Sequence, residues 1–172
     1  MKSEENTFVM YPANSIDTAL SLLKNISGIQ LLAGATLDKH IKSDFFSVSS
    51  IPEMLSIDRK ERYIDVGAAV SLGSLLDLGE SRIPSVLFEA IKTIGSPFSR
   101  NLATIGGNIC ASNAGFKYTL YAPLLALDAR LEIRTPSELP HNIPLSRLTA
   151  FPEKFLLTKI RIPLEDWNVS IF

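Results

Sequence analysis

The sequence has 172 residues, 46% of them apolar, with 17 basic and 18 acidic side chains and a formal net charge of -1. This length fits one globular domain with a real core, and the balanced charge, without a long run of either sign, argues against nucleic acid as a partner. A single cysteine excludes an internal disulfide and an iron–sulfur cluster, and two distant histidines without carboxylates at ligand spacing give no metal site.

The N-terminal stretch MKSEENTFVMYP is polar and acidic, whereas a signal peptide would need an apolar segment. No apolar run in the chain approaches the length that spans a membrane. We therefore expect a cytoplasmic protein with no membrane partner.

The first third of the chain is expected to form a small lobe of about residues 1–52. Residues 8–11 form a short apolar strand, and apolar residues at helical spacing over 16–23 predict a helix. A second, buried strand follows at 29–33, which completes a β-α-β unit, and a third strand is expected at 45–48.

The remaining residues, approximately 53–172, are expected to form a larger lobe of strands with helices laid against them. The chain contains no internal repeat and no low-complexity segment, and its fold class is α+β. The expected elements are a hairpin over 55–66 with a charged tip, helices over 72–76, 84–94 and 123–127, and strands over 130–134 and 155–162.

The stretch LLAGATL, residues 31–37, places Gly34 at the end of a buried strand and Thr36 two positions later. Loops of this kind expose backbone N–H groups that can bind phosphate without a charged side chain. Many strands end in glycine simply to turn, so this loop alone fits an ordinary turn as well.

The stretch TIGGN, residues 104–108, offers similar chemistry. Gly106 and Gly107 carry no Cβ to keep a ligand away, Thr104 brings a hydroxyl and Asn108 an amide. A hairpin turn explains the glycine pair equally well on local grounds. Two such loops can hold a dinucleotide at its pyrophosphate, although neither matches the Rossmann fingerprint.

No catalytic constellation of side chains is recognisable elsewhere: there is no P-loop, no G-x-S-x-G motif and no Cys–His pairing. Cys110, among small residues, is interpreted as a buried space-filling side chain rather than a nucleophile. Any chemistry performed here therefore belongs to a cofactor.

Five segments in this order resemble the flavin-binding subunit or domain of the molybdenum hydroxylases, the xanthine dehydrogenase and carbon monoxide dehydrogenase medium-subunit family. They are LLAGATL, FSVSSIPEM, DVGAAVSLGSLL, IGSPFSRNLATIGGNI and LLALDARLEIR, and the resemblance covers nearly the whole chain. It implies a two-lobed α+β fold, with a small βαβ-type N-terminal lobe and a larger lobe built on a mainly antiparallel sheet. It also implies FAD as the cofactor, held between the lobes.

The resemblance also implies which residues hold FAD and what the protein does. Electrons from a molybdopterin-binding large subunit would pass through the clusters of an iron–sulfur small subunit to FAD, and from there to NAD or another acceptor. The implied cofactor-binding residues are Leu32, Ala33, Gly34, Ala35, Thr36 and Leu37 in the first loop, and Thr104, Ile105, Gly106, Gly107 and Asn108 in the second.

The chain departs from this family at three places. Ala35 stands where the family has the second glycine of AGGT. After TIGGN the family has a segment of the type SPAAD, whose aspartate holds hydroxyls of the cofactor, whereas here no acidic residue occurs between Asn108 and Asp128. The chain ends at Phe172, where the family begins a C-terminal domain, so we expect that domain to be absent.

These departures leave two alternatives to a flavoprotein subunit. One is a flavin-free relative that keeps the fold and serves as an assembly or interaction subunit. The other is a stand-alone protein that binds a different phosphate-bearing ligand.

Overall fold

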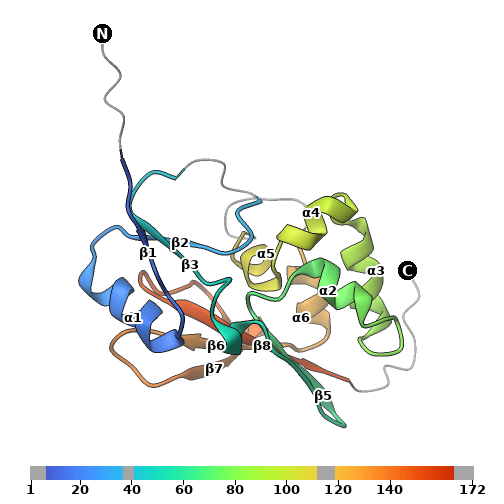
Figure 1. Cartoon of the computed structure of the whole chain (residues 1–172). Coiled ribbons are helices and arrows are strands. Elements are labelled where there is room, and N and C mark those ends of the chain that lie inside the picture. Colours follow the sequence, from blue (N-terminus) through green and yellow to red (C-terminus); the bar gives the residue numbers. More distant parts are fainter. Residues whose placement is uncertain (1–6, 37–40, 112–118, 165–172) are drawn as a thin grey trace.

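The computed structural model describes residues 7–36, 41–111 and 119–164. Two sheets organise the chain, and helices α2 to α6 lie on one side of the larger sheet (Figure 1). The elements are β1 (Met10–Tyr11), α1 (Ile16–Asn25), β2 (Gln30–Leu32), β3 (Phe45–Ser47), the 3-10 turn η1 (Pro52–Met54), β4 (Ile57–Arg59), β5 (Tyr63–Gly67), α2 (Leu72–Asp77), α3 (Ser85–Thr93), α4 (Pro97–Leu102), α5 (Ile105–Ala111), α6 (Tyr121–Ala126), β6 (Arg130–Arg134), β7 (His141–Pro144), η3 (Leu145–Arg147) and β8 (Leu156–Pro163).

The small sheet confirms the predicted β-α-β unit. Its strands are all parallel, and β3 lies between β1 and β2. Helix α1 connects β1 to β2 and begins where the Ser15 hydroxyl accepts a hydrogen bond from the Thr18 N–H at 3.1 Å. Its apolar side chains Ile16, Ala19 and Leu23 are buried, as the helical spacing predicts.

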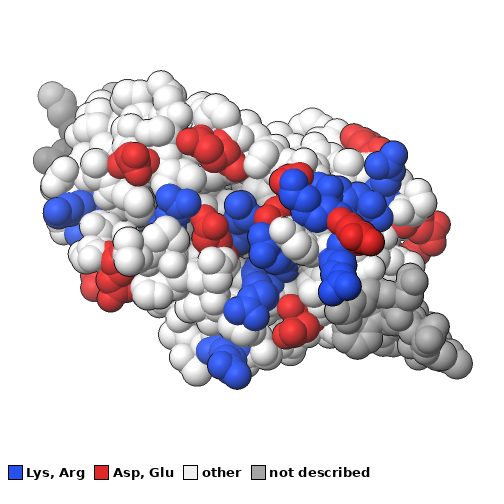
Figure 2. Space-filling view, turned by 90° about the horizontal axis from the view of Figure 1, so that it is seen from below, with Lys and Arg blue, Asp and Glu red and all other residues white. Residues whose placement is uncertain are grey.

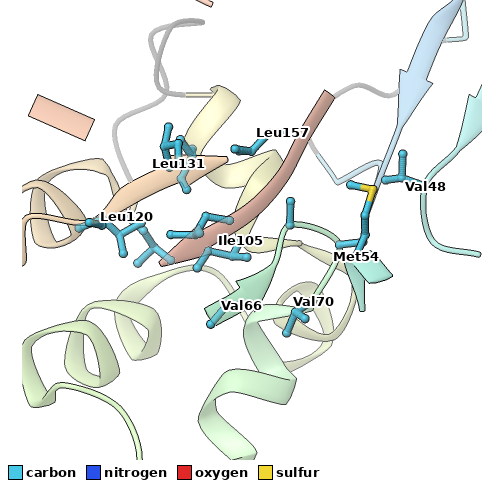
Figure 3. Close-up of a cluster of buried hydrophobic side chains, with 14 of the residues drawn as sticks. Val48, Met54, Val66, Val70, Ile105, Leu120, Leu131 and Leu157 are labelled. Carbon is cyan, nitrogen blue, oxygen red and sulfur yellow. The ribbon is translucent and has the colours of Figure 1, made fainter. Parts of the chain in front are cut away.

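The larger sheet is antiparallel, with strand order β4-β5-β8-β6-β7. The predicted hairpin of β4 and β5 is therefore confirmed, and β8, late in the sequence, pairs with β5 from the middle of the chain. Along β6 the buried Leu131 and Ile133 alternate with less buried residues. Buried side chains from both sheets and from α5 and α6 form one continuous core, part of which is labelled in Figure 3.

The opposite face of the larger sheet is charged. Arg161 on β8 donates two hydrogen bonds to the Asp65 carboxylate on β5, at 2.7 and 2.8 Å, and its guanidinium stacks on the Tyr63 ring. Lys and Arg side chains gather across the middle of this face, with acidic side chains between them (Figure 2). No helix within the described residues is long and apolar enough to cross a lipid bilayer.

Residues 97–111 differ from the sequence prediction, which did not expect a helix there. They form two helices, α4 and α5, so the glycine pair of TIGGN lies in the first turn of a helix rather than in a hairpin turn. Serine at position 96 accepts a hydrogen bond from the Ser99 N–H and caps α4, and Pro97 occupies a first-turn position that proline favours. Strand β7 was also not predicted, because its sequence HNIP has no apolar alternation.

Candidate functional site

A cavity of about 880 Å³ lies between the small sheet, helices α4 and α5, and the segment that leads into β8. This volume is near the upper end of the range for small-molecule and cofactor sites. The lining residues include 29–36, Ile94, Gly95, Ser99, Ala103, Thr104, Gly106, Gly107, Asn108, Cys110, Glu153, Phe155, Leu156 and Leu157.

The cavity brings together the two loops that the sequence singled out. Residues 32–36 line it from the end of β2, and Thr104, Gly106, Gly107 and Asn108 line it from the start of α5. Ile105 lies elsewhere, because its side chain is completely buried in the core. Leu37 is outside the described residues.

The first loop has backbone N–H groups for which the described part of the chain provides no acceptor. Among the residues that the structure describes, no acceptor receives the N–H of Ala33, Gly34, Ala35 or Thr36. Ala35 has a φ of 49, in the left-handed region. Successive N–H groups around a residue of that conformation form a concave site suited to an anion.

Gly34 is required here by the protein rather than by a ligand. A Cβ at this position would lie 1.8 Å from the carbonyl oxygen of Leu102 and 3.1 Å from Cα of Ala103. The backbone of the first loop therefore lies directly against the junction of α4 and α5. This contact sets the position of the loop relative to the second lining segment.

Ala35→Gly is expected to stabilise the protein by about 0.5 kcal/mol. The left-handed conformation costs an L-residue roughly 1–2 kcal/mol, and the greater flexibility of glycine in the unfolded chain offsets roughly 0.5–1 kcal/mol of the gain. Urea denaturation measures the difference. Ala33→Gly is the matched control, since Ala33 has no positive φ, and we expect it to destabilise; a lower stability of Ala35→Gly than of the unchanged protein would contradict the strain at this position.

The second segment differs from the first loop, because the N–H groups of residues 105–108 have acceptors within the protein. The N–H groups of Ile105 and Gly106 donate to the carbonyl oxygens of Val70 and Ala68, at 3.0 and 2.9 Å. A Cβ on Gly106 would lie 2.7 Å from the Ala68 side chain, so this glycine permits close packing on the residues after β5.

Thr104 is the polar side chain that this segment turns to the cavity. Its hydroxyl oxygen accepts a hydrogen bond from the Gly107 N–H at 3.1 Å, which caps α5, and its carbonyl oxygen accepts from the Asn108 N–H at 2.9 Å. A hydroxyl that accepts one bond still has a proton to donate. No described residue accepts that proton.

Asn108 has a structural partner. Its side-chain oxygen accepts a hydrogen bond from the buried N–H of Leu120 at 2.6 Å, and the Asn108 side chain is itself buried. This bond ties α5 to the residue before α6, because the Leu120 N–H has its acceptor on the neighbouring helix. The amide predicted as a ligand contact therefore also holds the fold together.

Cys110 lines the cavity but is not poised as a nucleophile. Burial raises the pKa of its thiol to about 11, so the thiolate is scarce at neutral pH. Within the described residues no three His, Cys, Asp or Glu side chains are grouped to hold a metal ion. The described lining residues can bind and orient a ligand.

Sequence reasoning assigned no role to the remaining wall of the cavity. Glu153, Phe155 and Leu157 come from the segment before β8 and from its first residues. Ile94 and Gly95 lie at the turn between α3 and α4, and Ser99 lies in α4. This segment was noted in the sequence only for its resemblance to the family. No local pattern marks these residues, because only the tertiary fold brings them to the cavity.

Residues 5–165 match the sequence model of a family described as the FAD binding domain in molybdopterin dehydrogenase. The probable aldehyde oxidase 3 of Oryza sativa subsp. japonica is 27% identical over 97% of this chain, and the abscisic-aldehyde oxidase of Arabidopsis thaliana is 30% identical over 90%. The chain spans 12% of the length of each of these relatives.

The fold is also found in solved structures. A carbon monoxide dehydrogenase of Hydrogenophaga pseudoflava matches with a TM-score of 0.79 and 24% identity, over 91% of this chain and 58% of the matched chain. Quinoline 2-oxidoreductase of Pseudomonas putida 86 matches with a TM-score of 0.79 and 16% identity, over 93% of this chain and 60% of the other. At these identities the structural matches show the fold, including its small parallel and larger antiparallel sheets.

Proposed function

Since the chain belongs to the family of FAD binding domains in molybdopterin dehydrogenases, we propose that it binds FAD in the cavity described above and forms the flavin-bearing, electron-transferring part of such a dehydrogenase. The observation that carries this proposal is that residues 33–36, whose N–H groups have no acceptor among the described residues, line the same cavity as Thr104.

The residues present fit a dinucleotide. Neutral N–H donors in a concave loop suit a diphosphate, because they neutralise its charge without a counter-ion in the site. The cavity walls formed by Ile29, Leu31, Phe155 and Leu157 are largely apolar and suit flat ring systems.

In this proposal the residues of the chain bind FAD and orient it. The N–H groups of residues 33–36 would donate to the diphosphate oxygens, and the Thr104 hydroxyl would donate from the adjoining start of α5. The apolar walls keep water from the ring systems. FAD supplies the redox chemistry when bound, accepting electrons from a donor and passing them to an acceptor.

The electron partners lie outside this chain. Cys110 is its single cysteine, so the chain cannot hold an iron–sulfur cluster. We propose that an iron–sulfur subunit or domain donates electrons to FAD, and that a molybdopterin-binding subunit or domain oxidises the substrate, as in a xanthine dehydrogenase-like enzyme. NAD or another compound would accept the electrons from FAD. We propose that the protein works in the cytoplasm. The same parts could belong to one longer protein, since the matched aldehyde oxidases are far longer than this chain.

Purification under mild conditions, followed by heat release and chromatography of the released flavin, tests this function. We expect FAD in near-stoichiometric amount, together with molybdenum- and iron-containing partners in a pull-down. Partners recovered with a flavin-free chain, which FAD in solution does not saturate, would indicate an assembly subunit instead. A chain stabilised by ADP and not by FAD would indicate a binder of another phosphate-bearing ligand.

A further inference from the structure

Glu153 is the one carboxylate among the described residues that line the cavity. It lies in the segment before β8, close in sequence to Phe155, Leu156 and Leu157, which line the same space. The side chain is exposed, which places it where the cavity opens to solvent. No described residue forms a hydrogen bond or an ion pair with it.

The cavity extends well beyond the loop that suits the diphosphate. Its lining follows the chain from Ile29, before β2, to Thr36, after β2. The lining also includes Phe155 and Leu157, at the start of β8, and Ile94 and Gly95, after α3. A dinucleotide whose diphosphate lies at 33–36 would place its sugar hydroxyl groups against these other parts of the wall.

Sugar hydroxyl groups donate hydrogen bonds and therefore need acceptors in the protein. A carboxylate is the strongest hydrogen-bond acceptor that a side chain provides. Its two oxygens can accept from both hydroxyls of a vicinal pair, whereas a threonine or serine hydroxyl offers a single oxygen. The segment after TIGGN carries no acid up to Asp128, and Asp128 does not line the cavity. Glu153 is thus the described residue that combines a carboxylate with a position in the cavity wall.

We propose that Glu153 accepts hydrogen bonds from sugar hydroxyl groups of FAD and so positions the cofactor along the cavity. This assignment rests on the proposed FAD binding. It provides, from the segment before β8, the acceptor that the sequence lacks after TIGGN. The ribose of the adenosine half and the ribityl chain of the flavin half share this hydroxyl chemistry, and the test below distinguishes them.

Glu153→Gln tests the assignment, with Glu61→Gln as a matched control. Glu61 is exposed at the turn between β4 and β5 and does not line the cavity, so both variants lose the same charge. We expect Glu153→Gln to raise the Kd for FAD roughly tenfold, as the loss of a hydrogen bond to a charged group implies, with an unchanged melting temperature. Glu61→Gln is expected to leave both quantities unchanged.

Titrations with ADP and with FMN locate the contact. Weaker ADP binding with unchanged FMN binding assigns Glu153 to the ribose, and the reverse assigns it to the ribityl chain. A Kd for FAD within twofold of that of the unchanged protein would overturn the inference and leave the proposed function standing. Failure of the unchanged protein to bind FAD would instead overturn the proposed function, and the inference with it.

Discussion

Gly34→Ala is expected to abolish measurable FAD binding and to lower the free energy of unfolding by about 3 kcal/mol. The new methyl group would meet the Leu102 carbonyl oxygen at 1.8 Å and the carbonyl carbon at 2.7 Å. Both are backbone atoms, so the contact is relieved only if the loop moves away from the junction of α4 and α5. That movement separates the N–H groups of 33–36 from Thr104. Urea denaturation and a fluorescence titration with FAD measure the two effects.

Gly28→Ala is the matched control for this substitution. Gly28 lies between α1 and β2, has a φ of +70, and would place its new methyl group in open space. It is expected to cost about 0.5 kcal/mol, because the lower flexibility of alanine in the unfolded chain offsets part of the strain of a left-handed alanine, and to bind FAD with unchanged affinity. Normal FAD affinity in Gly34→Ala would show that the cofactor does not depend on the position of this loop.

Asn108→Ala is expected to lower the free energy of unfolding by about 2 kcal/mol. The substitution removes the acceptor of the Leu120 N–H, which lies buried at 2.6 Å from the Asn108 side-chain oxygen. A buried donor left without a partner costs roughly 1–3 kcal/mol. Because Asn108 also lines the cavity, FAD binding is expected to weaken as well. Urea denaturation monitored by circular dichroism measures the stability change.

Asn142→Ala provides the comparison for Asn108→Ala. Asn142 lies on the exposed side of β7, at the edge of the larger sheet. Its replacement is expected to change stability by less than about 0.5 kcal/mol. Equal stabilities of the two variants would contradict a structural role for the Asn108 amide.

The elements that the sequence predicted correctly carry strong local signals. Helix α1 has a serine cap and a regular apolar stripe, and the hairpin of β4 and β5 has apolar strands on either side of a charged tip. Short-range hydrogen bonds and burial of one face determine such elements. The parallel β-α-β unit of the small sheet could be predicted, because a helix connects its first two consecutive strands.

The helix that contains TIGGN could not be predicted from local signals. Glycine has a low helix propensity, and two in succession favour a turn. Long-range hydrogen bonds hold the start of α5: Ile105 and Gly106 donate to Val70 and Ala68, more than thirty residues earlier in the sequence. The sequence identified residues of the cavity wall, but no local pattern shows that Gly106 also packs against Ala68.

The wall opposite the two loops was likewise beyond sequence reasoning. Glu153 and Phe155 lie more than a hundred residues after the first loop, and they reach the cavity because β8 enters the middle of the larger sheet. Gly34 at the end of a strand indicates a loop with exposed N–H groups. The left-handed conformation of Ala35 could not be predicted, because alanine rarely adopts it.

Backbone amide resonances of the isotope-labelled protein, followed by NMR during a titration with FAD, test the central claim most directly. The N–H groups of Ala33, Gly34, Ala35 and Thr36 are expected to show the largest downfield proton shifts, saturating together with the quenching of flavin fluorescence, as they donate to the diphosphate. ADP is expected to shift the same resonances. Saturable FAD binding that leaves these resonances unchanged, or no binding at all, would contradict the account.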